Sequence, residues 1–227
     1  MLSGKGIVTD FQKDILRIFS SLPDSGFFYL TGGTALIEFY TGHRKSFDLD
    51  LFTSEKPILV PFSRILEESL RKKCSVTVVR RFETFVEMEA GRERENIRIH
   101  LAYDSPFRLR KSLETDLGVP VSDFEDLAAD KLLAFYGRTE PRDAIDVFFI
   151  LQMKDFKELA ELAQKKDPGF DLYWLAVALE KTGIFPDEID KWPVEMIVPV
   201  DIKDLKDQFA KLARQIMTQI RTKKTAG

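Results

Sequence analysis

The sequence predicts an α+β protein whose sheet lies in the first half of the chain and whose second half is helical. Between Phe27 and Asp104, short runs alternate polar and apolar residues, as strands do. After Ser122, apolar residues recur every three or four positions, as they do on helices. We therefore expect an α/β domain over residues 1–119 and a helical domain over residues 120–227.

Composition and charge narrow the class of protein. Hydrophobic residues make up 44% and charged residues 31% of the 227-residue chain, as in ordinary globular proteins. The formal net charge of −3 gives no overall basic field, so any RNA contact would need a local patch. The single cysteine, Cys74, cannot form an internal disulfide and fits a reducing cytoplasm. No apolar run is long enough to span a bilayer and the first residues lack a signal-peptide core, so we expect a cytoplasmic protein with no membrane partner.

Local signals define the elements of the first half. Thr9 and Gln12 form a capping box that predicts a helix ending before Pro23. The apolar run Phe27–Leu30 predicts a buried strand, and Thr34–Tyr40 predicts a short helix after it. Further elements are expected over Pro57–Lys73 (helix), Val76–Arg80 (strand), and Thr84–Ala90 with Asn96–Tyr103 (hairpin).

Capping residues and proline divide the second half into helices. Ser122 and Glu125 form a second capping box, which opens a helix that ends near Gly137. Pro141 suits the first turn of the next helix. Further helices are expected over Asp155–Gln164, Asp171–Lys181 and Asp201–Thr222.

A glycine turn follows the first predicted strand. Gly32 and Gly33 lie between that strand and the helix that begins at Thr34. Backbone N–H groups and the positive end of a helix dipole would meet there, which suits an anion such as a phosphate. Taken alone, such a turn is more often purely structural.

Two aspartates lie on the strand that follows. Phe47, Leu49 and Leu51 should share one face, and Asp48 and Asp50 the other, because strand side chains repeat every two residues. Two adjacent carboxylates repel each other unless water, bases or a cation intervenes. A divalent cation such as Mg²⁺ removes that cost and takes its remaining ligands from water and substrate phosphates. The alternative is an edge strand with two solvated acids.

The order of these two motifs resembles the nucleotidyltransferases of the DNA polymerase β type. The form Gly32-Gly33-Thr34-Ala35-Leu36, followed by Arg44-x-Ser46-x-Asp48-x-Asp50, is similar to the AbiEii/AbiGii branch, which includes toxins of toxin–antitoxin and phage-defence systems. The resemblance implies a mixed sheet with flanking helices, followed by a C-terminal helical region. It also implies transfer of a nucleoside monophosphate from an NTP to a hydroxyl of an RNA such as tRNA, or of a protein.

The resemblance assigns roles to residues of the two motifs. Asp48 and Asp50 become the ligands of Mg²⁺ or Mn²⁺, and the turn of Gly32, Gly33 and Thr34 becomes a nucleotide contact. A cognate antitoxin is the implied protein partner. From its strand face, Ser46 could bond a phosphate oxygen, and Arg44 could equally be a phosphate clamp or a surface charge.

One position departs from the family pattern. The family places a third carboxylate on a neighbouring strand, where this chain has His100. Histidine can bind a metal or take a proton near neutral pH, but it carries no fixed negative charge. Glu87, Glu89 and Asp104 are alternative third acids. The departure leaves open a catalytically degenerate nucleotide-binding protein, and a pure interaction or structural domain is a third hypothesis.

A second block of polar residues lies on the predicted helices after Ser122. Lys131 falls in the middle of an apolar helix stripe, although lysine is rarely buried without a partner. By the resemblance, Lys131 contacts the triphosphate and Asp143 or Asp146 belongs to the active site. The alternatives are a lysine that reaches solvent and an ordinary i,i+4 ion pair between Arg142 and Asp146.

Overall fold

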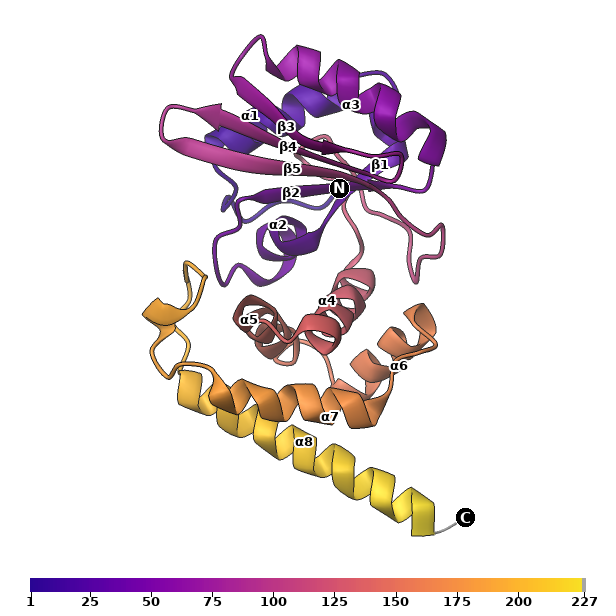
Figure 1. Ribbon diagram of the computed structural model, residues 1–227, viewed down its shortest axis with the longest axis vertical. Coiled ribbons are helices and arrows are strands. Elements are labelled where there is room, and N and C mark those ends of the chain that lie inside the picture. The colour runs from indigo at the N-terminus through magenta and orange to yellow at the C-terminus, as the bar shows by residue number, and fades with distance from the viewer. Residues whose placement is uncertain (226–227) are drawn as a thin grey trace. The chain divides into compact units, whose positions relative to one another are not determined.

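The computed structural model describes residues 1–225 and confirms the predicted α+β class (Figure 1). The chain divides into two compact units, Met1–Leu127 and Ala128–Gly227. The first unit extends beyond residue 119 because the strand that contains Leu30 bonds to the segment after it. The Leu30 N–H donates to the Pro120 carbonyl, and the Ser122 N–H donates to the Leu30 carbonyl. The assignment of two functional domains stays a prediction.

A five-stranded mixed sheet forms the centre of the first unit. Its strands are β1 (Phe28–Thr31), β2 (Asp48–Thr53), β3 (Ser75–Arg81), β4 (Phe85–Arg92) and β5 (Glu95–Tyr103). Their order in the sheet is β1-β2-β5-β4-β3. The β2–β5 pair is parallel and the other pairs are antiparallel, so β2 and β5 bring together residues that are about fifty positions apart in the sequence.

Two amphipathic helices cover one side of this sheet. Helices α1 (Asp10–Ser20) and α3 (Lys56–Leu70) lie together on that side in Figure 1, whereas the short α2 (Gly32–Leu36) lies on the other. The rings of Phe19 on α1 and Phe62 on α3 pack against each other with centroids 5.0 Å apart. The apolar side chains of the strands meet these helices, so their polar side chains face the opposite side of the sheet.

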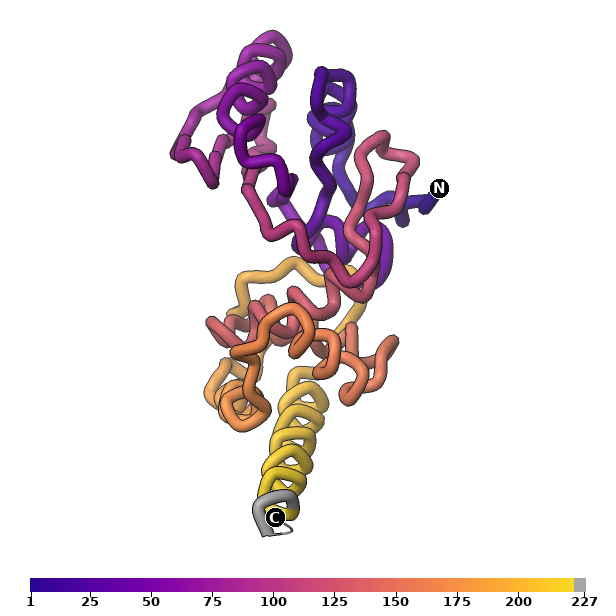
Figure 2. Tube along the Cα trace, turned by 90° about the vertical axis from the view of Figure 1, so that its right-hand side faces the viewer, coloured from indigo at the N-terminus to yellow at the C-terminus, as the bar shows by residue number. Residues whose placement is uncertain are grey.

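The second unit is helical. Its elements are α4 (Phe124–Arg138, within which the division between the units falls), α5 (Pro141–Ile150), α6 (Phe156–Lys166), α7 (Leu172–Lys181) and α8 (Ile202–Thr225). Helices α7 and α8 lie side by side in Figure 1, and Figure 2 shows α8 as a straight helix. Among the described residues, no helix combines the length and the apolar character needed to cross a bilayer.

Most local predictions are confirmed, and two are wrong. The capping box of Thr9 and Gln12 is present, and Pro141 lies in the first turn of α5. Phe47 does not share the buried face of β2, because the strand begins one residue later and the Phe47 side chain is 43% exposed. The cap of α4 is Asp123, whose Oδ1 accepts from the Glu125 N–H, and not the predicted Ser122 box.

A buried carboxylate fixes the N-terminal segment to the first unit. Glu38 is 1% exposed and lies in the single π-turn that follows α2, Ile37–Thr41. Its two oxygens accept from the backbone N–H groups of Gly6, Ile7 and Val8 at 2.7–2.8 Å. These bonds satisfy both oxygens of the buried carboxylate and the backbone donor of the buried Val8.

Replacing this carboxylate should lower stability. In Glu38→Gln, one of the two acceptor oxygens becomes an amide donor that faces backbone donors, so we expect the free energy of unfolding to fall by about 2 kcal/mol or more. Urea denaturation followed by circular dichroism measures it. Glu68→Gln, on the exposed side of α3, is the matched control and should leave the midpoint unchanged. Equal midpoints for the two variants would contradict this role of Glu38.

Candidate active site

The glycine turn lies directly against the carboxylate of Asp50. Gly32 has a φ of +71°, a conformation that favours glycine. A Cβ at this position would lie 2.0 Å from Asp50 Oδ2, closer than any real contact. The Thr34 hydroxyl donates to the backbone carbonyl of Asp48. The structure therefore brings Gly32, Gly33 and Thr34 together with Asp48 and Asp50.

Each of the two aspartates has a cationic neighbour on β5. Asp50 is in register with His100, and Asp48 with Arg98. The His100 Nδ1 lies 2.8 Å from Asp50 Oδ1. The Arg98 Nε lies 3.0 Å from Asp48 Oδ1. The predicted proximity of His100 to the acids is thus present, whereas Arg98 is a neighbour that the sequence did not single out.

The environment of His100 favours its protonated form. Burial lowers the pKa of His100, but the hydrogen bond to Asp50 and the charges of Asp50, Asp48 and Glu87 raise it, and the net pKa lies above the usual 6.5. The imidazole is therefore charged over a wider pH range than a free histidine, and it offsets part of the negative charge of Asp50.

A row of alternating charges crosses the sheet at this level. Thr31, Asp50, His100, Glu87 and Arg80 are in register across all five strands. The last pair is an ion pair, with 3.0 Å between the Arg80 Nε and Glu87 Oε2. Acids and bases alternate along the row, which avoids direct contact between like charges.

The three alternative acids occupy different places. Glu87 lies beside His100 in the row of alternating charges, and Glu89 is in register with Arg98 in the next row. Asp104 accepts from the Tyr29 hydroxyl at 2.9 Å and pairs with Arg108 at 3.1 Å. Glu87 is therefore the acid nearest in register to the position that His100 occupies.

The two aspartates fit a divalent cation with few protein ligands. Asp48 Oδ1 is buried and accepts no hydrogen bond, since the nearby Arg98 nitrogen does not have hydrogen-bond geometry. Such an atom needs a partner, and a hard cation with oxygen ligands suits it. Within residues 1–225 no group of three or more Asp, Glu, His or Cys side chains could hold a metal. Two carboxylates completed by substrate phosphates match the usual Mg²⁺ arrangement.

The structure also places Arg44 and Ser46. Arg44 is 6% exposed, and its Nη1 donates to the Lys45 carbonyl at 2.8 Å, so the alternative of a surface charge is wrong. Ser46 precedes β2, and its carbonyl accepts from the Gln12 amide at 2.9 Å.

In the second unit, two ion pairs join α4 to α5. The Lys131 Nζ lies 2.7 Å from Asp146 Oδ2, and the Lys131 side chain is 11% exposed. Arg138 donates to both oxygens of Asp143 at 2.6 and 2.7 Å. Both aspartates are fully buried.

These pairs rule out the two structural alternatives for this block, and the roles of Lys131, Asp143 and Asp146 at the triphosphate stay predictions. A lysine that reaches solvent is wrong, because Lys131 is buried and paired. Arg142 pairs with Glu140 at 3.0 Å, in place of the i,i+4 pair with Asp146. The partnership of Arg138 with Asp143 was missed. Its signal is the charge pattern, an arginine at the end of one helix and an acid in the first turn of the next.

The His100–Asp50 pair should be visible in a titration. In Asp50→Asn the negative acceptor is lost, so the pKa of His100 should fall, whereas Glu68→Gln should leave it unchanged. Proton NMR of the imidazole ring measures both. Because the folded pKa is raised, the stability from this pair is fully present below about pH 6.5 and is lost as the pH rises through the folded pKa. A His100 pKa that is equal in the wild type and Asp50→Asn would contradict the pair.

Filling the space at Gly32 should be costly. Gly32→Ala places a side chain at positive φ and against Asp50, so we expect it to lower the free energy of unfolding by about 1–3 kcal/mol. Gly26→Ala is the control, since its Cβ would meet nothing within 4 Å. Urea denaturation compares the two variants, and equal stability would show that the turn does not press on Asp50.

Comparisons with known proteins agree with this geometry. The profile of the family described as "Nucleotidyl transferase AbiEii toxin, Type IV TA system" matches residues 14–222. Protein aq_aa25 of Aquifex aeolicus, described as uncharacterized, is 30% identical over 164 residues, which cover 70% of this chain and 76% of that protein.

Two solved structures have a similar fold. MenT4, a nucleotidyltransferase toxin of Mycobacterium tuberculosis, superimposes with a TM-score of 0.64 at 16% identity, over 91% of this chain and 82% of that one. JHP933 of Helicobacter pylori gives 0.57 at 15% identity, over 95% and 92%. Because the family profile matches residues 14–222, the chain belongs to the AbiEii family of nucleotidyltransferase toxins.

Proposed function

We propose that this nucleotidyltransferase moves a nucleoside monophosphate from an NTP to a hydroxyl acceptor, with Mg²⁺ or Mn²⁺ at Asp48 and Asp50. The observation that carries the proposal is the contact between the Gly32 turn and Asp50, since it puts a phosphate-binding type of turn beside two acids on one strand face. The acceptor oxygen forms a bond to the α-phosphorus as the bond to pyrophosphate breaks.

In this proposal the chain mainly binds and orients the nucleotide. The turn of Gly32, Gly33 and Thr34 contacts the phosphates, and Arg44 and Ser46 precede the two acids in the same segment. The cation, when bound, would hold the phosphates and reduce the charge at the transferred phosphorus. His100 is a positioning residue, because its bond to one oxygen of Asp50 orients that carboxylate.

Lys131 supplies a positive group for the triphosphate in this proposal. Its ammonium is desolvated, and an ammonium in such a place interacts strongly with a phosphate. Asp146 holds the ammonium, so a triphosphate would share Lys131 with Asp146. Asp143 supports the same helix pair through Arg138.

The biological role that we propose is that of a growth-inhibiting toxin. The family supports it, together with a cognate antitoxin as partner and an RNA such as tRNA, or a protein, as acceptor. We also propose the cytoplasm as the compartment, where Cys74 stays reduced.

Loss of either acid should remove transfer. With labelled NTP, Mg²⁺ or Mn²⁺, and total RNA or protein, we expect the wild type to label an acceptor, and Asp48→Asn and Asp50→Asn to lower the rate at least about a hundredfold. Glu68→Gln is the charge-matched control and should keep the wild-type rate. Transfer that survives in both aspartate variants would sink the proposed site.

The alternative, a nucleotide-binding protein without catalysis, is favoured by one observation. His100 contacts Asp50 at the position where the family has a third carboxylate, and this contact raises the pKa of the imidazole. It predicts saturable NTP binding without transfer in the wild type and in His100→Asp. If the wild type transfers label, or if His100→Asp gains transfer, the alternative is wrong. Calorimetry for binding and label incorporation for transfer give the two readouts.

A further inference from the structure

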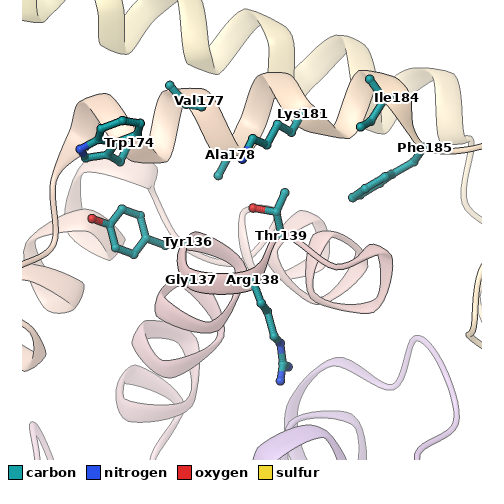
Figure 3. A pocket seen from close by; sticks show the side chains of 10 residues that line it. All are labelled: Tyr136, Gly137, Arg138, Thr139, Trp174, Val177, Ala178, Lys181, Ile184 and Phe185. Atoms are coloured by element: carbon teal, nitrogen blue, oxygen red, sulfur yellow. The ribbon is translucent and has the colours of Figure 1, made fainter.

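A pocket of about 460 Å³ lies within the helical unit (Figure 3). Its walls are the end of α4 with the residue that follows, Thr139, and the face of α7 continued by Phe185. This volume lies in the range of small-molecule sites. None of the residues assigned above to the phosphates or the cation lines it.

Aromatic rings line both ends of the pocket. Figure 3 shows Trp174 and Tyr136 on opposite walls at one end and Phe185 at the other. Trp174 is 58% exposed, although a large aromatic side chain gains free energy from being covered. The ring of Tyr173, itself 45% exposed, packs edge-on against Trp174 with centroids 5.2 Å apart. A second aromatic surface therefore adjoins the pocket.

The charges of the lining are positive. Arg138 and Lys181 are its ionisable cations, and the lining contains no carboxylate residue. The Arg138 guanidinium is largely neutralised by its two bonds to Asp143. None of the ion pairs found among the described residues involves Lys181, which lies on the exposed side of α7. The pocket therefore offers aromatic surface and about one uncompensated positive charge.

We propose that this pocket binds one nucleotide unit of a single-stranded RNA, with the base against Trp174 and Tyr136 and the phosphodiester at Lys181. Every base has a flat face that stacks on aromatic rings, and a cation beside the rings holds the backbone. Tyr173 then serves the neighbouring base. That the bound strand is the acceptor of the transferred nucleotide rests on the proposed function.

The charge balance separates an RNA strand from a free NTP. A phosphodiester carries one negative charge, which one lysine matches. A triphosphate carries about four charges and is usually bound with a divalent cation, for which this lining has no carboxylate. The pocket is therefore a second nucleotide site, distinct in chemistry from the turn beside Asp50.

Tryptophan fluorescence tests the proposal in the full-length protein. The chain has two tryptophans, and the other, Trp192, is 4% exposed with its ring N–H bonded to the Pro186 carbonyl. A titration with a six-nucleotide single-stranded oligoribonucleotide, without NTP or metal, should therefore quench Trp174 selectively. We expect Trp174→Ala and Lys181→Gln to weaken binding about tenfold or more, measured by fluorescence anisotropy of a labelled oligonucleotide.

Matched variants distinguish base stacking and the local charge of Lys181 from effects of unfolding or of overall charge. Trp174→Phe keeps an aromatic ring and should bind within a few-fold of the wild type. Lys203→Gln, an equal change of charge on exposed α8, should change affinity less than about twofold. Thermal melting checks that each variant is folded, which is expected because Trp174 and Lys181 are exposed.

Three results would overturn the proposal. The first is oligonucleotide binding that is absent, or equal in the wild type, Trp174→Ala and Lys181→Gln. The second is stronger quenching by free ATP than by the oligonucleotide, which would make the pocket an NTP site. The third is a change of oligomeric state in Trp174→Ala by light scattering, which would make it a protein interface. Label transfer by the wild type is measured separately, so the RNA pocket can fail while the proposed transfer reaction stands.

Discussion

The contact between a left-handed glycine and a strand carboxylate is the constraint on which the candidate active site depends. At Gly32 there is no room for a side chain, because Asp50 Oδ2 occupies that space. This contact fixes the distance between the glycine turn and β2. The Thr34 hydroxyl, at the start of the helix, donates to the Asp48 carbonyl of the same strand. A small shift of either segment would separate the phosphate-binding type of turn from the acids. The same packing contact therefore stabilises the fold and sets the geometry of the site.

On the polar face of the sheet, both aspartates of β2 lie beside a basic side chain of β5. In the row through Asp50 the acids and bases alternate, and Asp48 faces Arg98 in the next. Such pairing lowers the cost of placing two carboxylates side by side without a cation. Because of this pairing, a cation would compete with His100 and Arg98 for the carboxylate oxygens of Asp50 and Asp48. In a site with three carboxylates no such basic neighbour competes.

The parts of the site that the sequence could predict are local ones. The glycine turn and the alternation of Asp48 and Asp50 depend on a few neighbouring residues, and so do the capping box of Thr9 and the proline at the start of α5. The partners of these residues depend on strand register. The proximity of His100 to the acids was predicted only through the family resemblance, because it depends on the parallel register of β2 and β5, and the same register brings Arg98 to Asp48, which was not predicted. Phe47 was misplaced for a related reason. The alternating sequence pattern already includes Phe47, whereas β2 begins at Asp48.

In the helical unit, too, the sequence pattern predicts which side chains are buried but not which residues they contact. The position of Lys131 in an apolar stripe predicted a buried lysine, but periodicity alone did not identify its partner. The α4–α5 hairpin supplies that partner, Asp146. Lys131 and Arg138 are seven residues apart, about two turns of one helix, and their partners are three apart on the next, so the inner pair closes near the bend and the outer pair further along. Because removal of one partner would leave a buried charge, the two pairs fix the register of this hairpin. The end of α4 with Arg138 is thereby held in place, and it is this end that forms a wall of the aromatic pocket.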